Sequence, residues 1–266
     1  MQRAARRPEM WLLLLGTIVL IAWALLLFGG SAFSLPAFCA AQAWTTVPLS
    51  VSLDLALLFN SPGQLATGWA LMVVAMMLPL AIAPLWHVRE RSFAARRGRS
   101  MALFVAGFVA IWIAAGVILQ AVALLARWAV PMPLACLGVA IVAALLWQVS
   151  PAKQWCLNRC HQRPPLAAFG RSADLDAFRF GAWNGGACIG ACWALMLPML
   201  LIGQGQLPVM IVVTLFALAE SLEDPAPLAW RWRGGGKALR ILAAWWPTIP
   251  QPGSRRYFPL LTKSRI

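Results

Sequence analysis

Long apolar runs separated by short polar or basic segments dominate this sequence. A hydrocarbon core of about 30 Å takes roughly 20 apolar residues per helix. The runs that approach this length cover residues 10–28, 65–87, 101–126, 134–149, 181–203 and 208–222. We therefore predict an all-α protein, a polytopic transmembrane helical bundle with six spanning helices. This domain covers residues 1–225, and residues 226–266 form a basic cytoplasmic or interfacial tail.

Three segments break the simple pattern of straight apolar helices. Pro79 and Pro84 fall inside the second run, so we expect that helix to bend or unwind in its cytoplasmic half. The outer loop 31–63 contains an apolar stretch that is too short to span, and we expect it to lie in the outer interface. The apolar part of the tail contains Arg240 and is interrupted by proline, which is typical of an interfacial segment on the inner leaflet.

Composition and charge agree with a membrane protein. The chain is 61% hydrophobic and only 11% charged, whereas soluble domains carry about 25% charged residues. Apart from Arg127, every Lys and Arg lies in one of four clusters, at residues 3–7, 89–99, 153–179 and 231–265. By the positive-inside rule these clusters face the cytoplasm. We therefore expect both termini and the loop 150–180 to be cytoplasmic, in a bacterial cytoplasmic (inner) membrane.

The net charge of +14 thus reports topology and contact with anionic lipid. It does not favour a nucleic-acid partner.

Sulfur-containing side chains follow a helical period in two of the runs. In the fifth run Cys188, Cys192 and Met196 stand at i, i+4 and i+8, on one stripe of a helix. Met72 and Met76 repeat the four-residue spacing in the second run. These stripes are either a face for a soft metal or a packing face that contains sulfur, since methionine is also a common filler of cores.

Glycines accompany the cysteines of the fifth run. The pairs Gly181 and Gly185, and Gly186 and Gly190, are each four residues apart. Such spacing lets a neighbouring helix approach closely.

The loop before the fifth run adds further candidate ligands. Cys156, Cys160 and His161 fall within six residues, and the two thiols share a face if the segment is helical. This C-x3-C pair could meet the second pair, at Cys188 and Cys192, across the short loop. In a reducing cytosol these thiols stay free.

Glu220, near the cytoplasmic end of the sixth run, is the remaining candidate ligand. An ionisable group within a span is a functional candidate. It could equally reach water among the headgroups.

Three motifs in this sequence follow a shared pattern. The first is carried by Trp69, Met72, Ala75, Met76, Met77, Pro79 and Pro84. The second is carried by Gln148, Pro151, Lys153, Cys156, Leu157 and Cys160. The third is carried by Gly181, Gly185, Cys188, Gly190, Cys192, Trp193, Leu195 and Met196. With these motifs the chain resembles a family of bacterial multi-pass proteins of unknown function, described as predicted metal-binding integral membrane proteins and often named copper chaperones.

The chain departs from the family pattern at three positions. Asn184 stands where the pattern has histidine, Ala191 where it has the first of two adjacent cysteines, and Ser221 where it has lysine. Because an imidazole and a thiol are among the better metal ligands, we expect weaker or altered metal binding in this chain.

These observations favour a non-enzymatic, membrane-embedded protein that handles Cu(I) for transport, storage or delivery to a partner protein or membrane enzyme complex. The candidate ligands are mostly soft thiols and thioethers, which select Cu(I). They are Cys188, Cys192, Met196, Cys156, Cys160, His161, Met72, Met76 and Glu220. Zinc, with four tetrahedral Cys or His ligands, and the oxygen-seeking calcium and magnesium fit less well.

The alternative is a non-catalytic structural or assembly subunit whose sulfur residues only pack. A catalytic redox subunit is disfavoured, since His87 and His161 both lie at the cytoplasmic edge and do not suit a bis-His haem in the bilayer. Transport of an organic solute stays open, because broken helices also build transporter sites.

Overall fold

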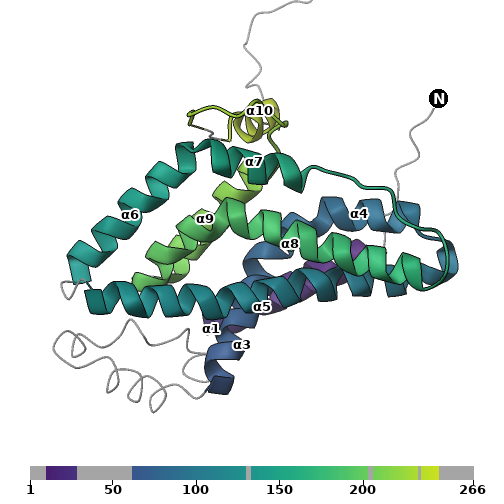
Figure 1. Cartoon of the computed structure of the whole chain (residues 1–266), viewed down its shortest axis with the longest axis horizontal. Coiled ribbons are helices and arrows are strands. Elements are labelled where there is room, and N and C mark those ends of the chain that lie inside the picture. Colours follow the sequence, from purple (N-terminus) through teal and green to yellow (C-terminus); the bar gives the residue numbers. More distant parts are fainter. Residues whose placement is uncertain (1–9, 29–61, 130–132, 203–205, 233–234, 246–266) are drawn as a thin grey trace, which may run out of the picture.

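The computed structural model describes residues 10–28, 62–129, 133–202, 206–232 and 235–245, and this part of the chain contains helices and no strand (Figure 1). The all-α fold is confirmed. The α-helices are α1 (Met10–Phe28), α3 (Pro62–Met77), α4 (Ile82–Arg91), α5 (Arg97–Ala129), α6 (Pro133–Val149), α7 (Pro151–Cys160), α8 (Gly170–Leu201), α9 (Gln206–Ser221) and α10 (Gly236–Trp245). Two short 3-10 helices, η4 (Pro79–Ala81) and η5 (Ala94–Arg96), connect α3 to α4 and α4 to α5.

Several of these helices are long and apolar enough to cross a membrane. Within the described residues α1, the segment 94–123 and α8 satisfy this condition individually. Two bent pairs, α3 with α4 and α6 with α7, satisfy it only together, and α9 is shorter at 16 residues. The structure thus supports three to five spans, while the six-span topology stays a prediction.

The second predicted helix is broken where its prolines fall. A bend of 46° separates α3 from α4. Pro79 has no backbone N–H to donate to the Ala75 carbonyl four residues earlier, and the indole of Trp23 on α1 donates to that carbonyl instead, at 3.1 Å. The interruption is therefore stabilised by a neighbouring helix, as a freed carbonyl in an apolar environment requires.

Helices α5 and α8 lie along each other through the length of the bundle (Figure 1). Glycines permit the contact: a Cβ at Gly181 would lie 2.0 Å from the Phe104 carbonyl oxygen, and one at Gly185 would lie 3.1 Å from that of Phe108. On α5, a Cβ at Gly107 would lie 2.3 Å from the Phe178 carbonyl oxygen. The expected close approach at Gly181 and Gly185 is confirmed.

The ends of α4 and the starts of α5 and α8 lie together at one end of the molecule (Figure 1). Here Asp174 of α8 pairs with Arg96 at 2.6 Å and with Arg99 at 2.7 Å. Helix α8 begins at Gly170, whereas the apolar run predicted a start near residue 181. The first turns of the helix are polar, so they lie outside the apolar run, and the ion pairs of Asp174 stabilise them.

The tail begins with α10, which packs beside the end of α9 (Figure 1). Lys237 of α10 pairs with Asp224 at 2.7 Å, and the Lys237 ammonium lowers the pKa of that exposed carboxyl. The N-terminal arm, nearly all of the outer loop 31–63 and residues 246–266 lie outside the described residues.

Candidate metal site

A cavity of about 490 Å³ lies between η4 with the start of α4, the C-terminal end of α7, the middle of α8 and the end of α9. The broken proline helix forms one wall, through residues 79–84. The polar and sulfur-containing side chains in its lining are Cys160, His161, Arg163, Asn184, Cys188, Cys192, Glu220 and Ser221. Five of the nine predicted site residues are among them.

Helix α8 supplies the central pair of thiols. Cys188 and Cys192 are each 5% exposed and line the cavity. Because they are four residues apart on one helix, their side chains are neighbours, and the two thiols interact with each other. The helical spacing in the sequence thus places both sulfur atoms on one face, as predicted.

The second cysteine pair comes from α7 and meets the first. Cys160 lines the same cavity and interacts electrostatically with both Cys188 and Cys192. Cys156 is buried beside the cavity against α8: a Cβ at Gly190 would lie 2.4 Å from the Cys156 sulfur. The tertiary structure brings the two C-x3-C pairs together, with one of the four thiols outside the cavity lining.

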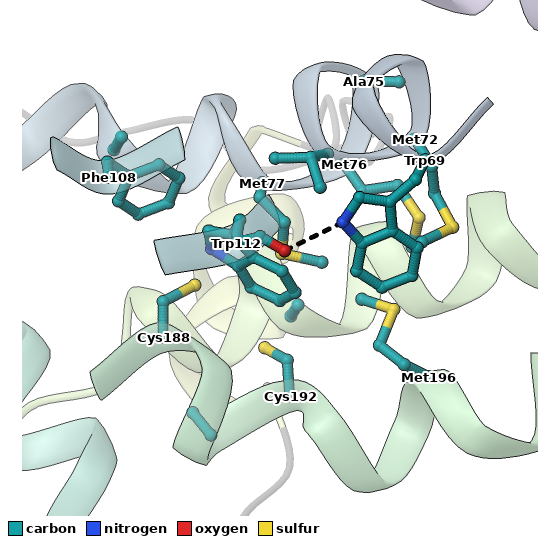
Figure 2. Packing of buried hydrophobic residues seen from close by; sticks show 14 of the residues in the cluster. Trp69, Met72, Ala75, Met76, Met77, Phe108, Trp112, Cys188, Cys192 and Met196 are labelled. Atoms are coloured by element: carbon teal, nitrogen blue, oxygen red, sulfur yellow. Dashed lines mark hydrogen bonds between the residues drawn. The ribbon is translucent and has the colours of Figure 1, made fainter. Parts of the chain in front are cut away.

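The candidate methionines lie in the core next to the cavity and do not line it. Met72, Met76 and Met196 are 0–3% exposed. Figure 2 shows their side chains in the space between α3 and α8, on the side of Trp69, while Cys188 and Cys192 point towards Trp112. The predicted sulfur face therefore divides into thiols at a cavity and thioethers in a packed interior.

His161 lines the cavity, but its ring is already held by the backbone. Nδ1 lies 2.9 Å from the Leu157 carbonyl oxygen, and Nε2 lies 3.3 Å from that of Ser221. A neutral imidazole has one N–H donor and one acceptor nitrogen. To coordinate a metal, His161 has to give up one of these two contacts.

Glu220 is bound to a lysine for which the sequence suggested no role. Both of its carboxylate oxygens lie 2.8 Å from the Lys153 ammonium, and Gln148 donates to Oε1. All three side chains are at most 4% exposed. The buried network joins α6, α7 and α9, and it gives Glu220 a structural partner at the edge of the cavity.

The local sequence explains how Lys153 reaches this position. Ser150 caps α7 by accepting a hydrogen bond from the Lys153 backbone N–H at 3.1 Å, and Pro151 occupies the first helical position. This is the residue order that favours a helix start. One feature of the sequence points to this ion pair: a single glutamate in an apolar helix, Glu220, needs a partner of opposite charge. Lys153 lies in a basic cluster of the sequence, and such clusters are expected to face the cytoplasm, so the sequence does not single it out as that partner.

The two substituted ligand positions of the family pattern both face the cavity. Asn184 and Ala191 belong to its lining, with Cys188 between them on the same helix. Asn184 is 5% exposed and donates to the Cys160 carbonyl at 3.5 Å. An imidazole at 184 and a thiol at 191 would therefore stand beside the cysteines.

The cavity offers few metal-binding side chains, and most of them carry the soft donor atom sulfur. Within the described part of the chain, no three His, Cys, Asp or Glu side chains converge closely enough to hold a metal ion. Thiols and thioethers fit Cu(I), which accepts low coordination numbers. Structural zinc takes four Cys or His ligands in a tetrahedral shell, and no such group is present among the described residues.

The fold and the cavity define an all-helical protein with apolar helices and a thiol-lined pocket at a broken helix. A family model described as PpoB2, copper chaperone, matches residues 66–245. The chain therefore belongs to the PpoB2 copper chaperone family, which confirms the resemblance seen in the three motifs. Searches of curated proteins and of solved structures found no match.

Proposed function

We propose that this protein binds Cu(I) as cargo at the cavity between α7, α8 and α9 and delivers it to a partner protein or membrane enzyme complex. The observation that carries the proposal is that Cys160, Cys188 and Cys192 line the same cavity. The first comes from α7, and the other two come from α8. Membership of a copper chaperone family supports the same cargo.

The primary ligands in this proposal are the Cys188 and Cys192 sulfur atoms, with Cys160 as the exchange ligand on the opposite wall. Cys188 and Cys192 are almost fully buried, whereas Cys160 is partly exposed, in the last turn of α7. A thiol at the exposed rim can take copper from or pass it to a second protein by ligand exchange. Met72, Met76 and Met196 form a soft, apolar backing to the site.

The protein acts in this proposal without catalysis, in the bacterial inner membrane. The bent helix α3–α4 counts as one span, and α1, α5, α6, α8 and α9 supply the other five. Helix α7 belongs to the cytoplasmic loop, and both termini face the cytoplasm. Support comes from the arginines that gather where α4 ends and α5 and α8 begin, since basic residues mark the cytoplasmic side.

A structural or assembly subunit is the second candidate function. It is favoured by the close burial of the sulfur atoms and by the absence of a converged ligand group among the described residues. The two functions differ in whether the isolated chain retains metal.

The test is metal content by mass spectrometry on the full chain, purified anaerobically in detergent and loaded with Cu(I). We expect stoichiometric copper in the parent chain and a clear loss in the Cys188→Ser, Cys192→Ser double variant. Cys136→Ser is the matched control, because this cysteine is buried on α6 and does not line the cavity. Equal, near-zero copper in the parent and the double variant would reject the copper function and favour the structural one.

A further inference from the structure

One polar group in the core next to the cavity lacks a well-formed hydrogen bond. Trp112 of α5 is 0% exposed, yet its indole Nε1 has no hydrogen-bond acceptor at suitable distance and angle among the described residues. It is the one buried side-chain nitrogen or oxygen of which this is true in that part of the chain. An indole N–H that is buried usually finds an acceptor, so this exception asks for a cause.

The ring of Trp112 is held firmly in place. The Trp69 indole donates to the Trp112 backbone carbonyl at 2.8 Å, and the two rings pack with their centroids 6.4 Å apart (Figure 2). Gly116 makes room for this contact, because a Cβ there would lie 2.3 Å from the Trp69 Nε1. The neighbouring helices thus fix the direction of the unpaired N–H.

The polar group that faces this N–H is the thiol of Cys188. Figure 2 shows the Cys188 side chain of α8 on the side of Trp112, and the two side chains interact. A neutral thiol is a weak hydrogen-bond acceptor. A thiolate carries charge, and hydrogen bonds to charged acceptors are shorter and stronger.

We propose that the Trp112 indole N–H is a positioning group for the metal site, which donates to the Cys188 sulfur when that sulfur is the thiolate bound to Cu(I). This inference rests on the proposed function. The N–H has no well-aligned acceptor in the structure, and a metal-bound sulfur at Cys188, which faces it, would supply one, so that part of its desolvation penalty would be relieved in the loaded protein. Hydrogen bonds to ligand atoms orient them and tune the metal site.

The Trp112 N–H would therefore raise the Cu(I) affinity of the protein beyond what the sulfur ligands alone provide. Outer groups of this kind typically change metal affinity by about 10–100-fold. The Trp112 ring packs in the core with or without Cu(I). A substitution that keeps an aromatic ring and removes the N–H can therefore test the effect of the N–H on Cu(I) affinity.

The experiment compares Trp112→Phe with the parent in the full, detergent-solubilised chain. Phenylalanine keeps an aromatic ring and removes the N–H. We expect Cu(I) affinity, measured anaerobically by competition with a chromophoric Cu(I) chelator, to fall about tenfold or more. Phenylalanine is smaller than tryptophan, so the Tm of the metal-free protein should fall in this variant, as in the control below.

Trp23→Phe is the matched control. Its indole N–H already has an acceptor, the Ala75 carbonyl at 3.1 Å, so its loss should lower the Tm of the metal-free protein and leave Cu(I) affinity unchanged.

Two outcomes would overturn the inference about Trp112 alone. One is an unchanged Cu(I) affinity in Trp112→Phe. The other is an equal fall in affinity in Trp23→Phe, which would mean that the loss follows from disturbed packing and not from the missing N–H of Trp112. Absence of Cu(I) binding to the parent chain would instead overturn the proposed function and this inference with it.

Discussion

The buried ion pair between Lys153 and Glu220 is the interaction whose removal should cost the most stability. Lys153→Met keeps the length of the side chain and removes its charge, which leaves a carboxylate that is 2% exposed without its cation. Breaking a buried pair on one side costs about 3–5 kcal/mol, because the remaining charge is uncompensated. Gln148 still donates to Glu220, which places the expected loss towards the lower end.

The double variant Lys153→Met, Glu220→Gln should recover most of that loss. Both charges are then gone, and an amide at 220 can still bond to Gln148. Replacing a whole buried pair by groups of similar volume is often close to neutral. The two single variants and the double variant form a cycle whose coupling energy isolates the pair.

Unfolding free energies in mixed detergent micelles would measure this cycle. Lys237→Met provides the control, since its pair with Asp224 lies at the surface, with the carboxylate side chain 81% exposed, and surface pairs contribute little. A Lys153→Met variant as stable as the parent, or a double variant no better than the worse single one, would refute the argument that the pair is buried and charged.

The remaining predictions concern packing, the cavity and pH. Gly181→Ala should destabilise the protein by about 1–3 kcal/mol, because the added Cβ would lie 2.0 Å from the Phe104 carbonyl oxygen. Gly186→Ala should be neutral or stabilising, since no atom lies within 4 Å of a Cβ at that position. Thermal unfolding compares the two variants, and equal Tm values would contradict the close α5–α8 contact. Asn184→His should raise Cu(I) affinity in the chelator competition by restoring an imidazole to the cavity, and an unchanged affinity would mean that this position does not reach the metal. Cu(I) affinity in the parent should fall as the pH is lowered, because the thiols must lose protons to bind; an affinity that is independent of pH would point away from thiolate ligands.

Helix identity and the faces of single helices could be read from the sequence. The apolar runs predicted α1, α5, α6 and α9 close to their observed bounds, and they predicted the end of α8 but not its polar start. Pro79 predicted the break in the second run, and the spacing of Gly181 and Gly185 predicted the close contact with another helix. These features depend on residues a few positions apart, and their geometry is fixed by the backbone of one helix.

The sequence predicted a candidate site on elements that line the cavity, but it described the sulfur atoms as a single face. Helical spacing put Cys188, Cys192 and Met196 on one stripe, yet only the two thiols line the cavity. A stripe says which side of a helix a residue occupies. It does not say whether a partner helix covers that residue or leaves a space in front of it.

The sequence by itself therefore determined a helical protein with apolar segments long enough to span a membrane, a proline break, glycine contact faces and paired cysteines at helical spacing. Only the tertiary structure decided that the α7 and α8 cysteines share one neighbourhood, that Lys153 pairs with Glu220 across 67 positions, and that Trp112 directs an unpaired N–H towards Cys188. The physical reason is that periodicity acts within a helix, whereas these contacts follow from the depth and angle at which different helices pack. Those quantities depend on all the packed side chains at once.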